Sequence, residues 1–186
     1  MSLDRRDALA GIAAMFGASL FAPIARAVAA QMTPISEGPP SAAVFTDRQR
    51  ALMTSLSERV MPTTDTPGAI AAGVPEFIEK LLADWAGPDE RKPILAGLDA
   101  IEERSQVDYK VTASKASPAQ QDALLTLAME GKFPAGAEFF DKFRQLVVTG
   151  YFTSEVGITQ ERDYLPVPGR YDGAFPYTPG TKVYSS

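Results

Sequence analysis

The chain has 186 residues, a formal net charge of -5, and 45% hydrophobic and 22% charged residues, so we expect one folded globular domain. It contains neither cysteine nor histidine. Their absence excludes disulfides, iron–sulfur clusters, covalently attached haem and histidine-based catalysis, and leaves little prospect of a zinc or copper site. No basic stripe is present to offset phosphate charge, so the composition also argues against a nucleic-acid partner.

Residues 1–30 have the organisation of an export signal. A charged start precedes thirteen uncharged residues, Leu9 to Phe21, and small residues follow up to Ala29 and Ala30. This is the order of a secretory signal, and cleavage is expected after Ala29 or Ala30. The uncharged stretch is too short to span a bilayer, which takes ~20 apolar residues.

An arginine pair in this segment indicates the export route. Arg5 and Arg6, followed by Leu9, resemble the twin-arginine motif, although Ala8 stands where that motif often has Phe. Twin-arginine export carries folded and commonly cofactor-loaded proteins. We therefore expect a periplasmic location, reached through the twin-arginine export machinery, and a second protein that travels with this chain.

The mature chain reads as an all-α protein, an irregular bundle of about five helices over residues 46–162 that follows an extended leader at residues 31–45. Apolar spacing and capping boxes predict the helices, and no strand periodicity competes with them. They are expected from Thr46 to before Pro62, from Pro75 to before Gly87, from about Pro93 to Ser105, from Ser117 to before Gly131, and from about Ala135 to Phe152. Trp85, in phase with Leu81 and Leu82, is interpreted as core or interface packing.

Residues 163–186 form an extended C-terminal arm rich in proline and aromatic residues. Proline and glycine rule out a helix, and a disordered tail is usually poor in aromatic residues. Two interpretations stay open: the arm packs on its own bundle, or it docks on a partner, since tyrosine is enriched at interfaces. Its aromatic residues are Tyr164, Tyr171, Phe175, Tyr177 and Tyr184.

The segment Asp65-Thr66-Pro67-Gly68 has the composition of a turn, in which Asp opens the turn, Pro presets the backbone and Gly accepts a positive φ. The turn has either a purely structural role or a role in contacting a partner protein. Tyr151 is expected to end the long apolar helix from about Ala135 to Phe152 and to fill the core rather than bind a sugar. The candidate interface residues are Asp65, Thr66, Pro67, Gly68, Tyr151, Tyr164, Tyr171, Phe175 and Tyr177.

Three segments together resemble the gluconate 2-dehydrogenase subunit 3 family. They are residues 59–78, which contain Asp65-Thr66-Pro67-Gly68-Ala69, residues 143–155, and residues 164–171. The resemblance covers most of the chain, and the segment around Asp65 is its most specific part.

The resemblance implies a small subunit of a membrane-associated sugar or sugar-acid dehydrogenase. Its partners would be a large FAD subunit of the glucose–methanol–choline type and often a cytochrome c subunit carrying haem c, through which it would associate with the inner membrane. The small subunit would supply the export signal and help the large one mature. The resemblance implies no catalysis here, and the chain lacks both the G-x-G-x-x-G and the C-x-x-C-H motifs, so we expect no cofactor in it.

Two other interpretations stay open. One is an independent exported module that binds a small ligand between its helices. The other is a hydrolase that uses carboxylates to cleave glycans.

Overall fold

The computed structural model describes residues 38–165 and, beyond them, residues 174, 176, 178, 181, 182, 184 and 185. Several residues singled out in the sequence therefore lie outside the described residues. They are Arg5, Arg6, Leu9, Ala29 and Ala30 of the export signal and Tyr171, Phe175 and Tyr177 of the C-terminal arm.

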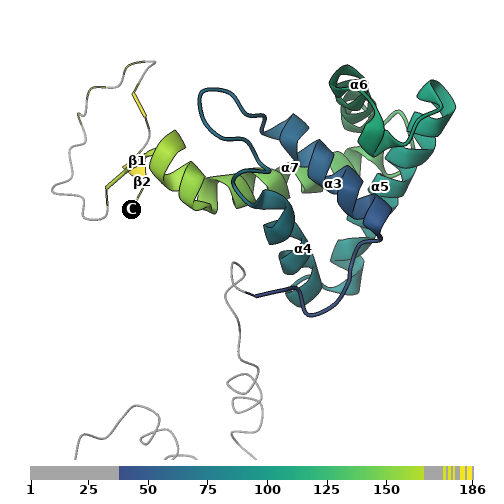
Figure 1. Cartoon of the computed structure of the whole chain (residues 1–186), viewed down its shortest axis with the longest axis horizontal. Coiled ribbons are helices and arrows are strands. Elements are labelled where there is room, and N and C mark those ends of the chain that lie inside the picture. The colour runs from purple at the N-terminus through teal and green to yellow at the C-terminus, as the bar shows by residue number, and fades with distance from the viewer. Residues whose placement is uncertain are drawn as a thin grey trace, which may run out of the picture. The chain divides into compact units, whose positions relative to one another are not determined.

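Five α-helices of the described residues confirm the predicted all-α fold (Figure 1). They belong to one compact unit that spans Pro39–Ser186. The helices are α3 (Asp47–Val60), α4 (Val74–Asp84), α5 (Pro88–Tyr109), α6 (Pro118–Met129) and α7 (Gly136–Thr153). A 3₁₀ turn, η1 (Ala113–Lys115), precedes α6, and a π-helical turn, η2 (Gly157–Glu161), follows α7. Two-residue strands β1 (Asp163–Tyr164) and β2 (Tyr184–Ser185) pair in parallel, with Asp163 opposite Tyr184.

Two helices begin at the capping boxes that the sequence predicted. The Thr46 hydroxyl accepts the Gln49 N–H at 3.3 Å, and the Gln49 side chain accepts the Thr46 N–H at 3.1 Å. Ser117 and Gln120 repeat this exchange at the start of α6. Each box satisfies backbone donors that the first helical turn leaves unpaired, which fixes where the helix starts.

The predicted third helix was wrong at both ends, because α5 runs from Pro88 to Tyr109 instead of from about Pro93 to Ser105. Proline fits the first position of a helix, where its missing N–H is not needed, so Gly87-Pro88 begins α5 as well as closing α4. The Gly87 N–H donates to the Glu90 carboxylate at 2.7 Å, which completes this start. Pro93 lies inside the helix and removes one hydrogen bond near its beginning.

The core forms around α7, whose aromatic side chains pack against α4, α5 and α6. The Phe139 and Phe143 rings stack with their centroids 5.2 Å apart. Gly97 lets α5 approach closely, because a Cβ there would collide with the Phe139 ring. The largest fully buried side chains are Leu52, Met53, Leu56, Val74, Ile78, Ile94, Leu98, Ile101, Leu124, Phe139, Phe143 and Tyr151.

Trp85 is not a core residue, so that part of its interpretation was wrong. The residue stands at the C-cap of α4 and is 49% exposed. In residues 38–165, no helix combines the length and the apolar character needed to cross a bilayer.

The chain enters the bundle along α4. The Lys80 ammonium, only 4% exposed as a residue, donates to the Pro39 carbonyl at 3.2 Å and pairs with Asp84 at 2.8 Å. The Ser41 N–H also donates to Asp84, at 2.8 Å. Hydrogen bonds from Lys80 and Ser41 lower the pKa of Asp84 to about 2. Phe45 then enters the core, so the residues just before α3 are fixed in place.

Candidate functional site

The loop between α3 and α4, residues 61–73, passes over the C-terminal half of α7 (Figure 1). Its base is closed by the Ala69 N–H, which donates to the Met61 carbonyl at 2.8 Å. Within it, the Thr64 N–H donates to the Thr66 carbonyl at 3.0 Å, which confirms the turn predicted there. We call residues 61–70 the anchored loop.

Tyr151 fastens the anchored loop to α7 from inside the core. The residue is 1% exposed, and its phenol donates to the Pro67 carbonyl at 2.9 Å. The phenol oxygen also lies 3.4 Å from the Thr66 hydroxyl, which donates to Glu161 of η2 at 2.8 Å. The prediction that Tyr151 fills the core is confirmed, and its hydroxyl additionally determines where the loop sits.

Two of the segments that carry the family resemblance are in direct contact through Gly150 of α7. A Cβ on Gly150 would lie 2.7 Å from Phe77 Cδ1 and 3.3 Å from Val74 Cγ1. Only a residue without a side chain allows α4 and α7 to approach this closely. Residues 59–78 and 143–155 therefore pack directly on each other, although 64 residues of chain separate them.

Glu58, in the last turn of α3, was missed by the sequence reasoning. Its Oε1 accepts the Thr63 N–H at 2.9 Å and the Thr63 hydroxyl at 2.8 Å, and its Oε2 accepts the Ile70 N–H at 2.9 Å. A signal did exist, because an acidic residue near a helix C-terminus opposes the helix dipole and calls for another explanation. Burial raises the pKa of Glu58, but the hydrogen bonds from Ile70 and Thr63 outweigh burial and leave the pKa below its ordinary value.

Gly68 is required for close approach and not for a positive φ, so the reason given from the sequence was wrong. The glycines with positive φ in the described residues are Gly38, Gly73 and Gly131. A Cβ on Gly68 would collide with the Glu58 carboxylate and lie 2.5 Å from the Thr63 nitrogen. Gly68 also donates its N–H to the Thr63 hydroxyl at 3.0 Å.

The tip of the anchored loop, Pro62–Asp65, is exposed, while Gly68 and Ala69 at its base are buried. The Thr64 hydroxyl donates to the Asp65 carboxylate at 3.0 Å. This hydrogen bond, together with one from the backbone of Asp65 itself, lowers the pKa of Asp65, and the nearby Lys182 ammonium acts in the same direction. The tip thus presents an ionised carboxylate on a held backbone.

The C-terminal segment returns to the same end of the bundle. The Lys182 ammonium donates to the Gln160 carbonyl at 2.6 Å, and β2 pairs with β1. The Arg162 guanidinium lies over the Phe152 ring, 4.8 Å from its centroid. Tyr164 is 53% exposed, so it does not pack into the bundle. The anchored loop, which contacts both α7 and η2, contains four of the candidate interface residues: Asp65, Thr66, Pro67 and Gly68.

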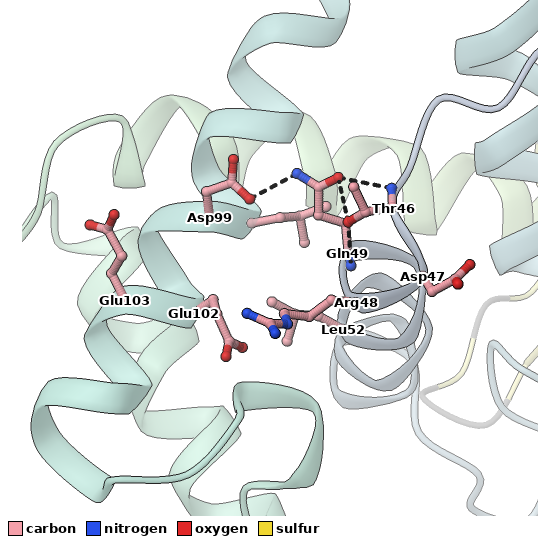
Figure 2. Close-up of a pocket in the computed structure, with 9 residues that line it drawn as sticks. Thr46, Asp47, Arg48, Gln49, Leu52, Asp99, Glu102 and Glu103 are labelled. Atoms are coloured by element: carbon pink, nitrogen blue, oxygen red, sulfur yellow. Dashed lines mark hydrogen bonds between the residues drawn. The ribbon is translucent and has the colours of Figure 1, made fainter.

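A separate groove of about 700 Å³ lies between the start of α3 and α5 (Figure 2). Gln49 donates to Asp99 across it at 2.8 Å, and Glu102 accepts the Ala113 N–H at 2.9 Å, so the chain's own groups already occupy these polar atoms. Of the candidate interface residues that the structure describes, none lines it. The groove is lined by Thr46, Asp47, Arg48, Gln49, Leu52, Leu98, Asp99, Glu102 and Glu103.

Comparison with known proteins gives one match. A family model described as gluconate 2-dehydrogenase subunit 3 matches residues 47–169, which include α3 to α7 and the anchored loop. No curated protein and no solved structure matches the chain. The match covers more than half of the chain, and the chain therefore belongs to the gluconate 2-dehydrogenase subunit 3 family.

Proposed function

We propose that this chain is the non-catalytic small subunit of an exported, FAD-dependent sugar or sugar-acid dehydrogenase. The observation that carries the proposal is the family match over residues 47–169, because the family is named as a subunit of a dehydrogenase. In this proposal the large subunit holds FAD and performs the oxidation, and a cytochrome c subunit with haem c accepts the electrons where one is present.

The residues of this chain support a role in binding rather than in catalysis. Histidine and cysteine are absent from the sequence. Around the anchored loop, the carboxylates of Glu58 and Glu161 accept hydrogen bonds from the loop itself. Both carboxylates hold the loop in place, and the hydrogen bonds that lower the pKa of Glu58 also make it a weaker base.

The N-terminal residues support a second role, in export. A folded-protein export route has little use for a chain without a cofactor unless a loaded partner leaves with it. We therefore propose that the large flavin subunit folds in the cytoplasm, binds this chain, and crosses the inner membrane under the signal that contains Arg5 and Arg6.

Affinity purification of the full-length tagged chain from its native periplasm tests the subunit role. We expect a large flavoprotein to co-purify, while the chain expressed alone is strongly helical and shows no flavin or haem absorbance. Recovery of the chain without any flavoprotein, or a visible spectrum that stays with the isolated chain through gel filtration, would contradict the proposal.

Replacement of both Arg5 and Arg6 by Lys tests the export role. Lysine keeps the charge but lacks the planar guanidinium with its fixed donors, so a receptor that recognises arginine should reject it. We expect dehydrogenase activity to move from the periplasmic to the cytoplasmic fraction, or to be lost. Unchanged periplasmic activity would show that the large subunit is exported without this chain.

A further inference from the structure

Glu58 holds the anchored loop at two points that lie far apart along the loop. One oxygen accepts both donors of Thr63, and the other accepts the Ile70 N–H. The carboxylate occupies the space that a side chain at residue 68 would fill. Glu58 therefore ties the two arms of the loop together, in addition to the Ala69–Met61 hydrogen bond at the base and the hydrogen bond from Tyr151 to Pro67.

The tip of the anchored loop, which Glu58 holds, has little buried surface. Pro62–Asp65 are all exposed, so burial of apolar surface does not explain why the tip is fastened. Ordering an exposed segment costs conformational entropy. A surface that is ordered before binding loses less of this entropy when a partner arrives, and it binds more tightly for that reason.

We propose that Glu58 is a positioning residue that holds the tip, Pro62–Asp65, in the shape that docks onto the large flavin subunit. This inference rests on the proposed function. The tip carries one charged side chain, Asp65, which is exposed, held by the Thr64 hydroxyl at 3.0 Å, and near the Lys182 ammonium of the same chain. The matching surface of the large subunit is expected to place a basic side chain opposite this carboxylate.

Glu58→Gln separates the shape of the loop from the folding of the helices. The glutamine oxygen keeps an acceptor for Thr63, but its NH₂ group faces the Ile70 N–H, so two donors oppose each other. We expect the dissociation constant of the full-length chain for the FAD-containing large subunit to rise about tenfold. Amide hydrogen exchange at Ile70 is expected to accelerate, with little change in helicity.

Two further variants and a control sharpen the test. Thr63→Val removes the hydroxyl that donates to Glu58 and accepts from Gly68. It is expected to weaken binding without adding to Glu58→Gln, because both act through one anchor. Asp65→Asn is expected to weaken binding while exchange at Ile70 stays unchanged. Glu103 is an exposed glutamate on α5 with no hydrogen bond or ion pair among the described residues. Glu103→Gln is therefore the matched control and should bind as the unaltered chain does.

The outcomes separate this inference from the proposed function. Failure of the unaltered chain to bind any large flavoprotein overturns the proposed function, and this inference with it. Normal binding by Glu58→Gln despite faster exchange at Ile70 overturns this inference alone, as does normal binding by Asp65→Asn. Unchanged exchange at Ile70 in Glu58→Gln would show that Glu58 is not the anchor and would also overturn it.

Discussion

The two ends of α3 use polar side chains in different ways. At the N-terminal end, Thr46 and Gln49 form a capping box and Gln49 also donates to Asp99. Arg48 lines the groove there, with its guanidinium directed toward Glu102 (Figure 2). At the C-terminal end, Glu58 reaches out of the helix and binds the backbone of the loop that follows.

The polar residues at the N-terminal end cap the helix, whereas Glu58 at the C-terminal end fixes the conformation of a loop. A capping box satisfies the backbone donors of its own helix and is a common way for a helix to start. Glu58 lies near the negative end of the helix dipole, where a carboxylate is unfavourable, and its hydrogen bonds go to residues outside the helix. The C-terminal end of α3 therefore carries the feature that is less common among helices, and substitutions at the two ends should have different effects.

The largest effect is expected from Gly68→Ala at the C-terminal end. The added methyl group would collide with the Glu58 carboxylate and press on the Thr63 backbone, which cannot move aside without opening the loop. Overpacking of this kind costs about 1–3 kcal/mol, and thermal unfolding of the full chain measures it. Gly87→Ala is the control for a methyl group added without a collision, because its Cβ would lie 3.6 Å from the nearest atom, Glu90 Oε2. It should lose only the smaller amount by which alanine is a poorer N-cap than glycine. Equal melting temperatures for the two variants would contradict the packing described for Gly68.

The sequence predicted the fold well where local signals were strong. Capping boxes at Thr46 and Ser117 gave the starts of α3 and α6. The start of α5 was missed because Pro88 suits both the end of one helix and the first turn of the next. Proline composition alone does not distinguish these two positions.

The candidate site was predicted only in part, because its contacts are long-range. The turn at Asp65 and the buried position of Tyr151 followed from composition and helical spacing. The hydrogen bond from Tyr151 to Pro67 joins residues 84 positions apart, and no local pattern encodes it. Glu58 was overlooked because a glutamate on a helix is usually a solvated charge.

A smaller effect is expected from Tyr151→Phe, which keeps the ring in the core but removes its hydroxyl. The Pro67 carbonyl then loses its donor at 2.9 Å inside a half-buried loop. An unsatisfied group of this kind costs about 1–2 kcal/mol, which corresponds to a melting temperature lower by roughly 2–8 °C. Tyr109→Phe is the control, because no hydrogen bond of the Tyr109 hydroxyl is found among the described residues. A loss as large in Tyr109→Phe would show that removal of any phenol hydroxyl has this effect.

A smaller effect on stability is expected when the pH is lowered and Glu58 becomes protonated. The pKa of folded Glu58 is lowered, so the stability that its carboxylate contributes is fully present above the unfolded pKa, about 4.3. That contribution is lost as the pH falls through the lower folded pKa. The melting temperatures of the unaltered chain and of Glu58→Gln should therefore differ by a constant amount from neutral pH to about pH 5, and should converge below the unfolded pKa. A difference that grows as the pH falls would contradict the assigned direction of the pKa shift.

The smallest effect is expected at the N-terminal end of α3, beside the groove between α3 and α5. If the chain were instead a small-ligand-binding module, this groove would be the binding site. Arg48→Ala and Glu103→Ala change exposed side chains that line this groove. Surface substitutions of this kind usually alter stability by less than about 0.5 kcal/mol. Millimolar gluconate or glucose should leave the melting temperature of the unaltered chain and of both variants unchanged, because a ligand stabilises a protein only when it binds the folded state. A gluconate-dependent rise in the unaltered chain that disappears in Arg48→Ala would assign ligand binding to the groove. The N-terminal end of α3 would then be the functional end, and the comparison of the two ends would be reversed.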